Sequence, residues 1–136
     1  MSLRTFADLL LAARQQPEPQ RLLLVFASVE LPADASAAQR AAFESGEGGV
    51  LTPVLCVDKA PDEIADFSTL CDESKHAGIS WQLVFVGSLP GKAGHPPSAD
   101  EAARPLKLMV ESIRGGRIAS FLTVDRQGEL IQLRAA

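Results

Sequence analysis

Two side chains with chemical potential share a glycine- and proline-rich loop, Gly87 to Ser98. Lys92 and His95 could both contact an anion there, because loops beyond the carboxyl ends of strands are common binding positions. Asp58 and Lys59 end an apolar segment before a predicted helix, so we expect them at a sheet rim beneath that loop. These four residues are candidates for a ligand-binding site or, alternatively, for an enzyme that acts on a small anionic substrate.

The start of this loop, Gly87-Ser88-Leu89-Pro90-Gly91-Lys92-Ala93, has some features of a phosphate-binding P-loop. In that motif, backbone N–H groups and a lysine hold the phosphates, and a following hydroxyl binds Mg²⁺. Here Gly87 and Gly91 are separated by three residues, one fewer than the motif has, and Ala93 stands where the hydroxyl is needed. The sequence therefore favours a flexible loop over a nucleotide site.

The remaining reactive side chains are dispersed. The two cysteines, Cys56 and Cys71, each fall in an apolar pattern that predicts a buried small side chain. A redox-sensing thiol is an alternative that requires one of them to be accessible. The sequence contains no metal-ligand spacing and no arrangement typical of a Ser-His-Asp triad. We therefore predict no catalytic residue, no metal site and no cofactor.

Charge and hydropathy narrow the classes of partner. The 136 residues carry a formal net charge of −4, which argues against binding to nucleic acid. The apolar runs are far shorter than the roughly 20 residues that span a bilayer, and the first residues lack the apolar core of a signal peptide. We expect a cytoplasmic protein with reduced cysteines that binds no membrane.

Capping-box patterns predict two helices in the first half of the chain. Thr5 with Asp8 begins a helix that continues to Arg14, where the Pro-Glu-Pro segment ends it. Ser36 followed by Gln39 begins a shorter, alanine-rich helix that we expect outside the main core.

Apolar runs predict three strands. The continuous run within residues 20–30 is typical of a strand covered on both faces. Val50 to Val57 predicts a second strand, in which Pro53 favours an edge position or a bulge. Trp81 to Leu89 predicts the third.

The second half of the chain adds two helices and a hairpin. One helix is predicted from Pro61 to Gly78, and another from Pro105 to the glycine pair that follows Arg114. Residues 117–124 and 129–133 predict two strands joined by a turn.

These elements predict an α/β fold in a single domain that spans residues 1–136. It would have a mixed five-stranded sheet, packed helices and a C-terminal β-hairpin. In an α+β alternative, the Ser36 helix is an excursion within a hairpin that joins the first two strands.

Two segments, Leu9–Leu31 (LLLAARQQPEPQRLLLVFASVEL) and Gly48–Ile64 (GGVLTPVLCVDKAPDEI), resemble a family of short, mainly proteobacterial proteins of uncharacterised function. Members often carry the label "ribonucleotide reductase subunit alpha". The catalytic subunit of that enzyme is several times longer and needs a cysteine pair plus a third, radical-bearing cysteine, whereas this chain has two cysteines. A fainter similarity, over Thr52–Phe67, connects the chain with the enhanced-serine-sensitivity proteins. This second resemblance implies a non-enzymatic module, and neither resemblance assigns a functional residue.

The sequence therefore predicts a small, uncharacterised bacterial protein that acts as a non-catalytic accessory or ligand-binding module. Its partner would be another protein or a small anionic ligand. The strand edge near Pro53, or exposed parts of the apolar stripes, could support a homodimer.

Overall fold

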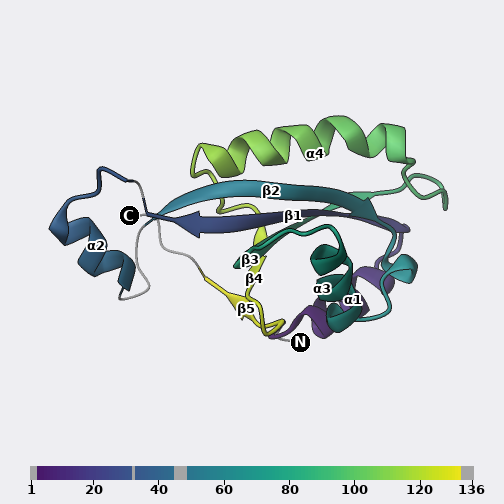
Figure 1. Cartoon of the computed structure of the whole chain (residues 1–136). Coiled ribbons are helices and arrows are strands. Elements are labelled where there is room, and N and C mark those ends of the chain that lie inside the picture. Colours follow the sequence, from purple (N-terminus) through teal and green to yellow (C-terminus); the bar gives the residue numbers. More distant parts are fainter. Residues whose placement is uncertain (1–2, 32, 45–48, 133–136) are drawn as a thin grey trace.

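Helices cover both faces of one five-stranded sheet (Figure 1). The computed structural model describes residues 3–31, 33–44 and 49–132. The elements in chain order are α1 (Phe6–Arg14), β1 (Gln20–Glu30), α2 (Ala37–Glu44), β2 (Val50–Lys59), the 3₁₀ helix η1 (Pro61–Glu63), α3 (Phe67–His76), β3 (Leu83–Pro90), α4 (Ala99–Arg114), β4 (Leu122–Val124) and β5 (Leu130–Ile131). The strand order in the sheet is β2-β1-β3-β4-β5.

All pairings between these five strands are antiparallel. The predicted five-stranded sheet with packed helices and a closing hairpin is confirmed, but its strands do not run in mixed directions. The α+β alternative describes the connection, because β1 and β2 form a hairpin with α2 as an excursion between them. A connection that returns beside its own strand makes an antiparallel pair, whereas a parallel pair requires a crossover over the sheet.

The buried centre of the sheet is β1, in which every residue from Leu22 to Ser28 is buried. Its side chains alternate between two apolar clusters. Leu24 and Phe26 pack in the cluster with α1 and α3, while Leu23 and Val25 pack in the cluster with α4. Each such side chain contributes roughly 1.5–3 kcal/mol through burial. The prediction of a strand covered on both faces is thus confirmed.

The capping boxes of the first two helices form as predicted. The Thr5 hydroxyl accepts a hydrogen bond from the Asp8 amide at 3.2 Å, and the Asp8 carboxylate accepts one from the Thr5 amide. Ser36 and Gln39 make the same reciprocal pair at the start of α2. In Figure 1, α2 projects away from the sheet, in keeping with the expectation that it lies outside the main core.

The single helix predicted from Pro61 to Gly78 is two helices. The 3₁₀ helix η1 ends at Glu63, and α3 begins after Asp66, whose carboxylate accepts a hydrogen bond from the Thr69 amide at 2.8 Å. This side chain caps a new helix and so interrupts the continuous one that was predicted.

The last predicted helix begins earlier than Pro105. Ser98 and Glu101 form a capping box, α4 starts at Ala99, and Pro105 lies inside the helix. The side chains of Leu106, Met109 and Ile113 are buried against the sheet.

The C-terminal hairpin is confirmed, with a shorter first strand. Residues 118–121 form a turn, closed by the Phe121 amide on the Ile118 carbonyl at 3.1 Å, before β4 begins. The Gly128 amide then donates to the Asp125 carbonyl at 3.1 Å in the turn between β4 and β5. Gly128 has a φ of +81°, which favours glycine. The predicted end of the last strand, at residue 133, lies outside the described residues.

Pro53 lies on an edge strand next to an irregularity, so both alternatives predicted for it apply. β2 is the outermost strand, and its register shifts where Phe26 is opposite Leu55 but Ala27 is opposite Pro53. Val54 is the extra residue of this bulge. Within the described part of the chain, the helices are too short or too polar to cross a bilayer.

Candidate functional site

The four candidate residues lie at one end of the sheet. Asp58 and Lys59 end β2, and Lys92 and His95 follow the end of β3. β1 pairs with both strands, so the ends of β2 and β3 lie on either side of its first residues. The remaining geometry separates Asp58 and Lys59 from each other and from Lys92 and His95.

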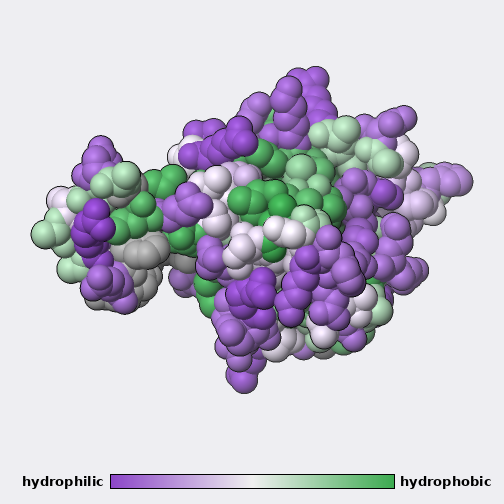
Figure 2. All heavy atoms as spheres, in the orientation of Figure 1, coloured by the Kyte–Doolittle hydropathy of each residue, from purple (hydrophilic) through white to green (hydrophobic). Residues whose placement is uncertain are grey.

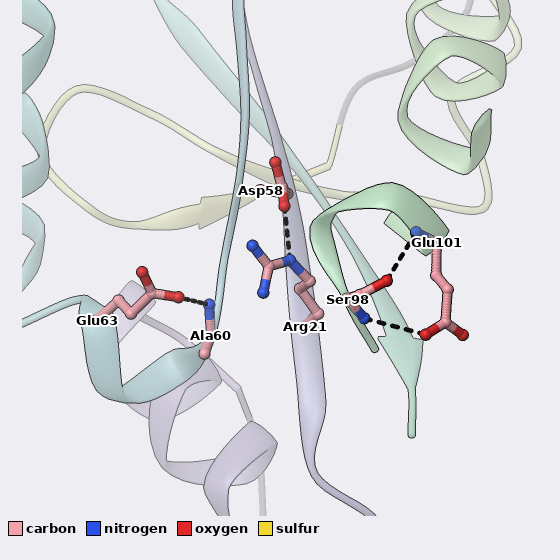
Figure 3. A network of polar contacts seen from close by, with 6 residues as sticks. All are labelled: Arg21, Asp58, Ala60, Glu63, Ser98 and Glu101. Carbon is pink, nitrogen blue, oxygen red and sulfur yellow. Dashed lines mark hydrogen bonds and ion pairs between the residues drawn. The ribbon is translucent and has the colours of Figure 1, made fainter. Parts of the chain in front are cut away.

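Asp58 is held by an ion pair on the α4 side of the sheet. Its Oδ2 lies 2.5 Å from Nε of Arg21 on β1, and the two side chains are 24% and 18% exposed (Figure 3). Asp58 lies opposite Leu23, which packs in the cluster with α4. The carboxylate therefore has a structural partner within the sheet.

Lys59 lies on the other face. Its Nζ is 3.1 Å from Oε2 of Glu73 on α3. Neighbouring residues in a strand point to opposite faces, so the sheet itself stands between the side chains of Asp58 and Lys59. A small ligand bound on one face of the sheet therefore contacts only one of these two side chains.

Lys92 and His95 close a tight turn. The Lys92 amide donates to the His95 carbonyl at 3.0 Å, and the His95 amide donates back to Lys92 at 2.9 Å. Gly94, at the tip, donates its amide to Oε2 of Glu18 at 2.8 Å. β3 extends to Pro90, so the segment is shorter and more regular than the flexible loop predicted from the sequence.

A shallow hollow of about 240 Å³ lies beside this turn. It is lined by Lys92, His95 and Glu101, together with apolar neighbours of β3 and the turn; neither Asp58 nor Lys59 lines it. Pockets that enclose small ligands are typically about 300–1,000 Å³. The structure thus brings Lys92 and His95 together and leaves Asp58 and Lys59 apart from them.

The start of α4, beside this hollow, is occupied by its own side chains. The Glu101 amide donates to Oγ of Ser98 at 3.1 Å, and the Ser98 amide donates to Oε1 of Glu101 at 3.2 Å (Figure 3). The helix N-terminus therefore already carries a carboxylate, which opposes the approach of a second anion. A P-loop-like phosphate site has no support in this geometry.

The two cysteines differ in exposure. Cys71 is half-buried beside the apolar cluster of α1 and α3, and burial raises the pKa of its thiol. Cys56 is exposed on β2, so the prediction that it is buried is wrong. The apolar run around Cys56 is a strand at the sheet edge, where a neighbour is missing on one side.

We expect iodoacetamide to alkylate Cys56 at least ~10-fold faster than Cys71 in the folded protein, because a thiol that is half-buried and has a raised pKa reacts slowly. Timed labelling followed by peptide mass analysis measures both rates, and labelling in denaturant should bring them together. Equal rates in the native protein would contradict the structure at Cys71.

Sequence reasoning missed two features at this end of the molecule. The first is Arg21, which follows a polar segment at the start of an apolar strand and neutralises Asp58. Its position in the strand is the signal that could have found it. The second is the exposure of Cys56 on β2, because Pro53 signals the edge position of this strand but not which of its side chains are exposed.

In the described ranges 3–31, 33–44 and 49–132, no three His, Cys, Asp or Glu side chains are grouped as metal ligands would be. The chain matches no protein-family model, no curated protein sequence and no solved structure at a significant level.

Proposed function

We propose that the chain is a non-catalytic binding module that takes up a short extended segment of a partner protein along the free edge of β2. The observation that carries this proposal is the exposure of this strand. β2 is ten residues long, lies at the edge of the sheet, and has no buried residue. From Val50 to Val57 it carries no charge.

An edge strand presents a row of unpaired N–H and C=O groups, and proteins usually protect such edges with charges, prolines or short length. Figure 2 shows hydrophobic residues over the middle of the view, where β2 lies in Figure 1. Added strands gain affinity from main-chain hydrogen bonds and specificity from alternate side chains.

The opposite edge of the sheet is much less available. β5 has two residues, and the Leu130 amide is already bonded to the Arg4 carbonyl at 2.9 Å. Thr5 adds an isolated bridge to Glu129. Of the two sheet edges, the β2 edge therefore favours a partner.

The bulge defines the size of the segment that would bind. Pro53 and Val54 interrupt the regular edge, so the continuous part runs from Leu55 to Lys59. Two copies of β2 would have to pair across both bulges to use their full length, which disfavours a homodimer at this edge. A single extended segment of another protein, paired along Leu55–Lys59, fits better.

The alternative, an enzyme at the loop that follows β3, has less support because neither Asp58 nor Lys59 lines the hollow beside Lys92 and His95. A cytoplasmic location stays a prediction from the sequence.

The test is selection of extended peptides from a displayed random library on the full-length chain, with affinities measured by fluorescence polarisation. We expect Cys56→Lys to weaken the selected peptides at least ~10-fold, because an edge lysine opposes strand addition. Cys56→Ser, which removes the thiol without adding charge, should retain binding, and so should Ser120→Lys, which adds a lysine at an exposed position near β4.

Binding should also slow hydrogen exchange at amides of Leu55–Lys59. The proposal fails if no peptide is enriched, if Cys56→Lys binds as well as the parent chain, or if protection appears in the Lys92–His95 turn instead. The last outcome would favour the loop as the binding site.

A further inference from the structure

We infer that the outward face of α4 docks against the same face of a second copy, with the two helices antiparallel about a two-fold axis. The surface consists of Glu101, Arg104, Leu108, Glu111 and Arg114, which we call the outer stripe. All five residues are exposed, and successive members are three or four positions apart, so they follow one side of the helix. In Figure 1 no other element lies over this side of α4.

The apolar member of the stripe lies at its middle. Leu108 is 52% exposed and is the most exposed of the large hydrophobic side chains described. The buried side of the same helix already carries a complete apolar row, which includes Leu106, Met109 and Ile113. Leu108 is thus not needed by the core of its own chain.

Most charges of the stripe are unpaired in the described part of the chain. Among the described residues, Arg104, Glu111 and Arg114 take part in none of the ion pairs and make no side-chain hydrogen bond. Glu101 uses Oε1 for the helix cap, which leaves Oε2 available. Unpaired charges of both signs therefore lie on either side of an exposed leucine. A partner whose own charges alternate in sign could pair with them.

The order of these charges selects a second copy as that partner. Arg104 and Glu111 are equally far from the midpoint between residues 107 and 108, and so are Glu101 and Arg114. When two antiparallel copies of α4 meet at this midpoint, Arg104 faces Glu111 of the other copy and Glu101 comes level with Arg114. Leu108 and the exposed Lys107 are then the two residues next to the axis. A two-fold interface requires this kind of self-complementary pattern.

Other arrangements lack this match. A parallel pair would place Arg104 against Arg104 and Glu111 against Glu111, which is repulsive. A strongly acidic or basic partner such as nucleic acid would meet charges of both signs on this side of α4. The dimer uses α4 and leaves the β2 edge free, so it stands independently of the proposed function.

The test is sedimentation velocity of the full chain over a range of concentrations at low and high salt. We expect a reversible dimer that weakens with added salt, because screening at ~0.1 M already acts over about 10 Å. Arg104→Glu and Glu111→Arg should each weaken the dimer about tenfold or more, since each converts two ion pairs into repulsive contacts. The double variant, which exchanges the two charges within one chain, should restore it.

Lys75→Glu, an exposed charge reversal on α3, is the matched control and should leave the dimer unchanged. Circular dichroism of each variant separates loss of docking from loss of fold. The inference is overturned if the parent chain stays monomeric at every concentration at low salt. It is also overturned if both single charge reversals leave the dimer as strong as in the parent chain, or if the double variant fails to recover the dimer.

Discussion

Replacement of Trp81 by alanine should lower the free energy of unfolding by about 3–5 kcal/mol, the usual cost of removing a large buried aromatic side chain. Trp81 is 2% exposed and is the only tryptophan in the chain. Its ring packs at 5.0 Å from Phe26 of β1 and 6.2 Å from Phe67 of α3, measured between ring centroids. The side chain therefore joins the sheet to the helices beneath it.

The polar contacts of Trp81 add to this cost. Its indole Nε1 donates to Oγ of Ser74 at 2.8 Å, and Ser74 is itself buried in α3. Truncation removes this donor, so the buried Oγ of Ser74 no longer accepts a hydrogen bond from Trp81. The Arg126 guanidinium also stacks over the ring, 4.3 Å from its centroid, and loses this contact.

Chemical denaturation followed by far-UV circular dichroism measures the effect, since the variant has no tryptophan fluorescence. Leu122→Ala is the matched control, because Leu122 is 42% exposed and its truncation should cost less than about 1 kcal/mol. Similar losses in the two variants would contradict the packing described for Trp81.

The second large effect is expected for Gly91→Ala, which should lower the free energy of unfolding by about 1–3 kcal/mol through overpacking. A Cβ at this position would lie 2.1 Å from the backbone oxygen of His95 and 2.9 Å from that of Pro19. Backbone atoms cannot move aside as a flexible side chain can. The Gly91 amide also donates to the Pro19 carbonyl at 2.8 Å, so displacement would break the link between the β3 turn and the start of β1.

Gly115→Ala is the control for this prediction. A Cβ there would also make a close contact, at 2.4 Å, but with the end of the Arg117 side chain, which can rotate away. Thermal unfolding should therefore show a lower melting temperature for Gly91→Ala and little change for Gly115→Ala. Hydrogen exchange at Lys92 and His95 should accelerate only in the first variant. Equal melting temperatures for Gly91→Ala and the parent chain would show that this turn adapts without cost.

Local signals predicted much of the fold. Thr5 with Asp8 and Ser36 with Gln39 form the capping boxes expected of them, because their hydrogen bonds span only three residues. Ser98 with Glu101 carries the same signal for α4, whereas Pro105, which favoured a later start, lies inside the helix. Asp66 likewise marks the start of α3.

The candidate site was less predictable. That Asp58 and Lys59 point to opposite faces follows from the two-residue period of a strand and could have been deduced from the sequence. The partners that hold them could not. Arg21 and Glu73 are distant in the chain and reach these residues only through the pairing of β1 with β2 and the packing of α3.

The sequence by itself determined the helix caps, the turn at Gly128 and the buried character of β1, since each depends on neighbouring residues or on one continuous apolar run. Only the tertiary structure decided strand direction, strand order and exposure. Pro53 favoured an edge position for β2, which is confirmed, yet the apolar pattern around Cys56 predicted a buried thiol, and Cys56 is exposed. Exposure depends on what lies beside a strand, and no residue within β2 specifies its neighbour.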